Sequence, residues 1–185
     1  PYDAGVRLIE QIKDEFLCLE SIINALDIAT TENDLNNIKE ELIITGYIKK
    51  NSKSKSKDNK NNKPLHYISS DGFDMYVGNN NLQNDELTFK FASNSDWWFH
   101  AKQMPGSHVI VKTNGKELPD RTFEEAAALA AYYSKCRDLD KVEVDYVLKK
   151  EVKKPAAAKP GFVVYYTNYS LIAIADIKGI KEVTG

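Results

Sequence analysis

The spacing of apolar residues changes twice along the chain and divides it into three parts. In residues 1–50, apolar side chains recur at steps of three and four, which is typical of helices. Residues 51–63 contain no apolar residue, and from residue 64 short apolar runs are separated by turn signals, as in strands. We therefore expect a helical segment over 1–50, a flexible linker over 51–63 and a separate domain over 64–185.

The first part predicts two helices that form a hairpin. The first helix should end within residues 28–30, Thr31 with Asp34 predicts a capping box for the second, and Gly46 suits its end. The apolar positions of the first helix have the spacing of a coiled-coil seam: Ile9, Ile12, Phe16, Leu19, Ile23 and Leu26. Two interpretations stay open, a hairpin packed on its own domain or the end of a longer antiparallel coiled coil.

The linker, residues 51–63, carries five lysines against one aspartate. Such a segment has nothing to bury, so we expect it to be solvated or to touch phosphate groups.

Strands are expected throughout the third part. Residues 66–68 and 73–77 predict a hairpin across the Asp71-Gly72 turn. Further strands are expected over 97–100, 108–111 and 142–147, with a last hairpin from 162–166 and 171–174.

Two helices complete this part of the chain. Asn81 is expected to cap a helix over residues 82–91, and Thr122 with Glu125 predicts a capping box for a helix over 123–136. The fold class is therefore α+β, with a mixed or antiparallel sheet, two covering helices and a preceding helical hairpin.

Composition narrows the class of protein. The 185 residues are 42% hydrophobic and 28% charged, which excludes wholesale disorder, and no apolar run is long enough to span a membrane. The net charge of −2 hides an acidic first part, −5 over residues 1–50, and a basic remainder of +3. Two isolated cysteines, Cys18 and Cys136, and no visible signal peptide lead us to expect a cytoplasmic protein without disulfides.

Residues 96–109 hold the densest group of chemically active side chains. Only Asp96, His100 and His108 could bind a metal, and adjacent Ser107 and His108 would point to opposite faces of a strand. We therefore expect no metal, no cofactor and no active site. Aromatic rings stack on bases and Lys or His donates to phosphates, so His100, Lys102, Ser107 and His108 are candidate RNA contacts. We expect His100, Lys102 and His108 to lie on one exposed surface.

Polar residues at the start of the helix expected over 82–91 form a second candidate site. Asn80 and Gln83 could bind an anion there, because the first N–H groups of a helix are free. The alternative is that these side chains simply cap the helix and build the turn.

A third candidate is a lysine cluster within residues 149–161. Its five lysines outweigh one glutamate, and Pro155 and Pro160 should keep the stretch extended. Such a cluster suits a phosphate backbone, although a solvated loop is the alternative. The lysines are Lys149, Lys150, Lys153, Lys154 and Lys159.

Three segments together resemble the NFACT family, in particular its C-terminal RNA-binding domain, NFACT-R. They are GNNNLQNDELTFKFA, DWWFHAKQMPGSHVIV, and DYVLKKEVKKPAAAKPG after EAAALAAYYSK. The resemblance covers about residues 65–175, and residues 1–50 resemble the coiled-coil arm that precedes this domain in the family. One departure is Asn79, where the family usually has a basic residue, so a phosphate contact there is not carried over.

The resemblance implies a part in ribosome-associated quality control. Family members bind large ribosomal subunits that carry a stalled peptidyl-tRNA and recruit a tRNA, and in bacteria they extend the nascent chain with alanine. The expected partners are therefore tRNA and the rRNA of the large subunit, with no membrane. Bacterial members were also named fibronectin-binding adhesins, so a protein-interaction module that binds fibronectin is the alternative.

Overall fold

Helices occupy the first part of the chain and strands dominate the rest, as the two apolar spacings predict. The computed structural model describes residues 2–49 and 63–184. The helices are α1 (Tyr2–Ile28), α2 (Glu32–Ile44), α3 (Asn81–Glu86), α4 (Asp120–Tyr132), the π-helical turn η1 (Leu87–Phe91) and the 3₁₀ turn η2 (Lys149–Glu151). The strands are β1 (Leu65–Ile68), β2 (Asp74–Val77), β3 (Trp97–Ala101), β4 (Val109–Val111), β5 (Val142–Leu148), β6 (Tyr169–Ala173) and β7 (Lys181–Glu182).

The two ends of helix α2 follow from its sequence. The Thr31 side chain accepts a hydrogen bond from the Asp34 backbone, and the Asp34 carboxylate accepts one from the Thr31 backbone, which is the predicted capping box. Past the other end, Gly46 adopts a positive φ of 84°, a conformation that favours glycine. The linker predicted over 51–63 lies outside the described residues, except for Lys63.

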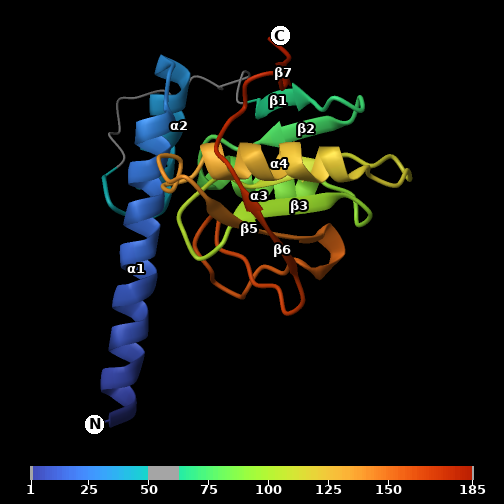
Figure 1. The fold of residues 1–185 in the computed structure, drawn as a ribbon. Coiled ribbons are helices and arrows are strands. Elements are labelled where there is room, and N and C mark those ends of the chain that lie inside the picture. The colour runs from blue at the N-terminus through green and yellow to red at the C-terminus, as the bar shows by residue number, and fades with distance from the viewer. Residues whose placement is uncertain (1, 50–62, 185) are drawn as a thin grey trace.

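Helix α1 packs with a different face from the one its spacing predicts. Cys18, Ile22 and Ala25 are buried with Ile38 of α2, whereas the predicted seam is exposed, with Phe16 60% accessible. The seam prediction is wrong for the contacts within this chain, because α2 and the sheet domain approach α1 beside the apolar stripe. Figure 1 shows α1 projecting past the domain at its N-terminal end.

The described residues form one seven-stranded antiparallel sheet, in the order β6-β5-β3-β4-β2-β1-β7. The α+β class and the β1–β2 hairpin are therefore confirmed. The hairpin predicted at the end of the domain is wrong, because β6 pairs with β5. Residues 162–166 form no strand there and contribute a single bridge, between Val164 and Lys153.

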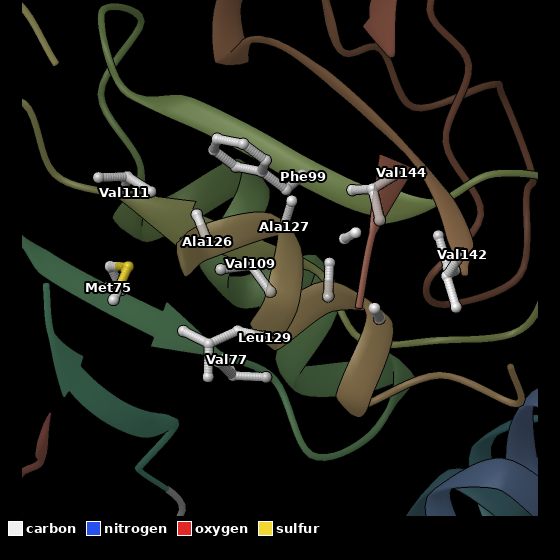
Figure 2. Close-up of a cluster of buried hydrophobic side chains, with 14 of the residues drawn as sticks. Met75, Val77, Phe99, Val109, Val111, Ala126, Ala127, Leu129, Val142 and Val144 are labelled. Atoms are coloured by element: carbon white, nitrogen blue, oxygen red, sulfur yellow. The ribbon is translucent and has the colours of Figure 1, made fainter. Parts of the chain in front are cut away.

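Alternating side chains on the sheet build two hydrophobic layers. Phe99 lies among the residues that pack against α4, while its neighbour Trp98 is buried on the opposite face with Leu87 of η1. Figure 2 shows Ala126 and Ala127 of α4 against Phe99 and its neighbours, where small residues let the helix lie close to the sheet. The two faces are thus covered by α4 and by the α3–η1 segment with the loop before β6.

Both helix starts predicted for this domain need correction. Asn80 rather than Asn81 caps α3, since its side chain accepts from the Gln83 backbone N–H. Helix α4 begins at Asp120, and its predicted capping box binds the β1–β2 turn instead. Thr122 donates to the Asp71 carboxylate, and Glu125 accepts from the Ser70 backbone N–H.

No helix within residues 2–49 and 63–184 has the length and apolar character needed to cross a membrane.

Candidate nucleic-acid interface

His100 and His108 meet on the face of the sheet opposite α4. Their rings are perpendicular with centroids 5.4 Å apart, and Trp98 contacts both rings. β3 supplies Trp98 and His100, and the residue before β4 supplies His108, so antiparallel pairing of these strands brings the residues together. The sequence therefore identified a real cluster.

His108 is buried and holds the structure together. Its Nδ1 lies 2.8 Å from the Thr88 hydroxyl, and its backbone N–H donates to the Asn84 side chain at 3.0 Å. Burial lowers the pKa of His108 well below its ordinary value, and the nearby His100 adds to this shift. Ser107 is also buried, because Gly106 beside it packs against Ser134. The expected exposure of His108 is therefore wrong, and Ser107, a candidate RNA contact, is enclosed as well.

His100 is half-buried and lines an open hollow of about 490 Å³. Burial lowers its pKa to about 4, and a hydrogen bond with the Gly106 backbone only partly offsets this effect. The ring is therefore neutral at neutral pH and can both donate and accept a hydrogen bond. Lys102 does not line this hollow, and its Nζ lies 2.5 Å from the Glu143 carboxylate.

The hollow lies where helix α1 meets the sheet domain. Leu17 and Ser21 of α1 form one wall, and Trp98, Phe162 and Tyr165 contribute aromatic surface to the others. This mixture of apolar rings and neutral donors suits a planar heterocycle better than a metal ion. In the described part of the chain, no group of three or more His, Cys, Asp and Glu could hold a metal.

The asparagine-rich loop before α3 is structural. Asn80 and Gln83 are buried, and the Gln83 amide oxygen accepts from the Asn79 backbone N–H at 2.9 Å. Both side chains are enclosed and make the contacts of the capping alternative, so they do not face solvent as anion ligands would. Sequence reasoning missed Asn84, whose side chain holds His108, although the run of asparagines was the available signal.

Asn81 joins this loop to the helical hairpin. Its side chain donates to the buried Glu41 carboxylate at 2.7 Å and accepts from the Ser21 hydroxyl at 2.7 Å. Desolvation raises the pKa of Glu41, although both hydrogen bonds from Asn81 act in the opposite direction. Gly161 lies against the same side chain, and a Cβ there would come within 2.4 Å of the Asn81 amide oxygen.

The lysine cluster forms an ordered, folded loop rather than an extended stretch. Residues 149–151 form a 3₁₀ turn, and the Lys153 and Val164 backbones hydrogen-bond to each other. Lys154 Nζ lies 2.6 Å from the Asp85 carboxylate, and Lys159 Nζ donates to the Tyr47 hydroxyl at 3.0 Å. These two lysines anchor the loop to α3 and to the residues after α2.

The remaining lysines of the loop, Lys149, Lys150 and Lys153, carry the positive charge that faces solvent. Lys150 and Lys153 are exposed, and Lys150 lies 4.0 Å from Glu151, at the limit of an ion pair. Lys149 is half-buried, with its ammonium 6.0 Å from the centre of the Phe89 ring. The same loop continues into residues 161–165, which line the hollow beside His100, so its exposed lysines and the hollow are parts of one segment.

Comparison with known proteins identifies one family. The profile of a family described as "NFACT protein RNA binding domain" matches residues 63–167. The chain is 44% identical over 176 residues to the Rqc2 homolog RqcH of Streptococcus pneumoniae serotype 2, covering 95% of this chain and 31% of that protein. It is 38% identical over 172 residues to the Rqc2 homolog RqcH of Bacillus subtilis, covering 90% of this chain and 30% of that protein.

A solved structure agrees with this match. The chain resembles the C-terminal part of the fibronectin/fibrinogen-binding protein from Streptococcus suis, with a TM-score of 0.88 and 42% identity. The similarity covers 95% of this chain and 71% of that one. The chain spans less than a third of the length of the two RqcH relatives.

Proposed function

The chain belongs to the family of the NFACT protein RNA binding domain, and from this premise we propose that it is the RNA-binding part of a ribosome-associated quality-control factor. In this proposal the domain binds tRNA and the rRNA of the large subunit that carries a stalled chain, and it supports template-independent alanine tailing by the longer protein. The names of the relatives, Rqc2 homolog RqcH, support the ribosomal role.

The observation that carries the proposal is the ordered lysine loop beside the hollow of His100. Lys154 and Lys159 fix the loop, so the backbone that carries its exposed lysines is ordered before any ligand arrives, and less entropy is lost on binding. Lys150 and Lys153 are placed to neutralise phosphates. His100 and the aromatic walls would contact a base, while Lys102 could contribute only after leaving Glu143.

The test measures binding to purified large ribosomal subunits and to tRNA as a function of salt. We expect Lys150→Ala with Lys153→Ala to weaken both, and to lower the slope of log affinity against log salt by roughly 0.7 to 0.9 per lost contact. A matched control is Lys116→Ala with Lys178→Ala, which removes two exposed lysines elsewhere. Equal effects of the two pairs would show that only net charge matters, and no effect of the first would overturn the loop as a binding site.

Fibronectin binding is a second candidate, because the similar solved structure belongs to a fibronectin/fibrinogen-binding protein. Immobilised fibronectin tests it with the same variants. Saturable fibronectin binding, together with no binding to subunits or tRNA, would replace the RNA proposal.

A further inference from the structure

A second hollow of about 530 Å³ lies between the β1–β2 hairpin and the α3–η1 segment. It is distinct from the hollow of His100 and shares no lining residue with it, and two of its walls have structural roles, since Gln83 braces the start of α3 and Leu87 packs beside Trp98. Pockets of this size accept small planar ligands and single residues of larger ones. Its side chains combine aromatic rings with two lysines.

The aromatic walls are held in a fixed arrangement. His66 and Tyr76 are directly paired across β1 and β2, and their rings stack with centroids 4.5 Å apart and planes 6° apart. Phe91 of η1 meets the Tyr76 ring edge-on at 4.8 Å. His66 is further fixed by its Nε2, 2.7 Å from the Asp74 carboxylate.

Phe91 is the ring most open to a ligand. Its side chain is 45% exposed, although burial of an aromatic ring is favourable. Behind it, the Lys112 ammonium lies 4.9 Å from the ring centre and pairs with the nearly buried Asp96. Phe91 is therefore supported from within the protein while much of its surface stays free.

Charge at the rim favours an anion close to these rings. Lys63 and Lys90 line the hollow and are exposed. Lys90 pairs with Glu86 at 3.2 Å, but both side chains are more than half exposed, so the pair is weak and can exchange its partner. Among the described lining residues Glu86 is the acidic one, so Lys63 and Lys90 together still leave the rim with a positive charge.

We propose that this hollow binds one unstacked base of single-stranded RNA, with the base against Phe91 and the His66–Tyr76 pair and its phosphate at Lys90 and Lys63. The inference rests on the proposed RNA-binding function and adds a specific base site to it. Aromatic faces beside lysines are the general means of binding single strands. The match to the RNA-binding family begins at residue 63 and includes every wall of the hollow.

The test uses the whole chain and a short single-stranded oligouridine that carries one 2-aminopurine. Stacking on a ring should quench the fluorescence of this base on binding. Phe91→Leu keeps an apolar side chain over Tyr76 but removes the aromatic face, and we expect it to weaken binding by about tenfold and to reduce the quenching. Phe16→Leu is the matched control, because this phenylalanine is 60% exposed on α1 and lines neither hollow.

A second variant guards against an effect on folding. Lys90→Ala leaves the rings intact and removes only an exposed, weak pair with Glu86, so it should weaken RNA binding while the unfolding transition, followed by circular dichroism, stays nearly unchanged. Two results would overturn the base site and leave the proposed function standing, provided that the chain still binds large subunits and tRNA. One is that the fluorescence of the labelled oligouridine is not quenched on binding, and the other is that Phe91→Leu quenches it as much as wild type does. Failure to bind any RNA would overturn both. Specific binding of an acidic peptide that Phe91→Leu abolishes, without RNA binding, would assign the hollow to a protein partner.

Discussion

His100 and His108 show how two residues of one type can take different parts in one site. His108 is completely enclosed and fixes Asn84 and Thr88, whereas His100 keeps part of its ring at the hollow. Both rings are neutral in the folded chain because burial disfavours their charged forms. This cluster therefore interacts with a ligand through hydrogen bonds and ring contacts rather than through positive charge.

The lowered pKa values of His100 and His108 predict that the folded chain loses stability as pH falls below about 6.5. The unfolded chain takes up protons from that pH, whereas folded His100 does so only near pH 4, so between these values protons favour unfolding. Each such group can contribute up to about 1.4 kcal/mol of unfolding free energy per pH unit. Denaturant unfolding at several pH values should show this slope, and His100→Gln should reduce it.

The raised pKa of Glu41 acts in the opposite direction, because protons stabilise a folded group whose pKa is raised. The comparison of wild type with His100→Gln isolates the histidine, since Glu41 is unchanged in both. An identical slope in the two proteins would contradict the assignment.

Helix α1 presents two different surfaces, and neighbouring residues separate them. Ile22 is 3% exposed and belongs to the cluster with α2, while Ile23 is 56% exposed and belongs to the predicted seam. The seam spacing correctly indicated an apolar stripe, but it could not indicate which side α2 and the domain would cover. That choice depends on contacts with Asn81 and Phe162, which are distant in the sequence.

We predict opposite outcomes for truncation of these two isoleucines. Ile22→Ala removes buried methyl groups and should cost roughly 2 kcal/mol or more of unfolding free energy. Ile23→Ala changes an exposed position and should stay within about 0.5 kcal/mol of wild type. Chemical denaturation of both variants measures the difference, and a larger loss from Ile23→Ala would mean that the predicted seam is the packed face.

Two similar sequence signals show how far local reasoning extends. Thr31 with Asp34 forms the predicted capping box, and the Asn79 side chain binds the other oxygen of the Asp34 carboxylate without displacing the box. Thr122 with Glu125 has the better box sequence, yet its side chains bind the β1–β2 turn. Helices, strands and caps that depend on neighbouring residues could be predicted from the sequence. Side-chain contacts with segments distant in the sequence could not.

The candidate site, too, was predictable from the sequence only where its residues lie close together in the chain. The sequence located the His100–His108 cluster and the lysine loop, because their residue types are dense within short stretches. It could not show that His108 is enclosed or that Lys154 and Lys159 are occupied, since Thr88, Asp85 and Tyr47 come from other segments. The aromatic hollow of Phe91 was missed because its rings come from β1, β2 and η1.

At the scale of the whole molecule, polar contacts fix the helical hairpin to the sheet domain. Glu41 binds Asn81, Lys135 pairs with Glu20, and the Asn24 side chain donates to the Tyr133 carbonyl at 3.4 Å. The hollow of His100 takes one wall from α1, so its shape depends on this attachment. Loss of the attachment should therefore alter the candidate interface even where the sheet stays folded.

Glu41→Ala tests this dependence. The change leaves two donors of Asn81 without their buried acceptor, which costs about 1 to 3 kcal/mol. Relative to wild type, we expect amide hydrogen exchange to become faster in α1 and α2 and to change less in β3 and β5. We also expect weaker binding of large subunits. Glu40→Ala is the control, because it removes the same charge from an exposed position of the same helix. Uniformly faster exchange across hairpin and sheet would show that the two parts unfold as one unit.

Asn81 gives this protein a constraint on how its sequence can diverge. The Asn81 amide accepts a hydrogen bond from the Ser21 hydroxyl of α1 and donates one to the Glu41 carboxylate of α2. The same side chain leaves no space for a Cβ at position 161, where the residue is glycine. Gly161 also has a φ of 82°, so a larger residue there would be strained twice. Related sequences should therefore keep these four positions or exchange them together, and the correlation would join segments up to 140 residues apart, from Ser21 to Gly161.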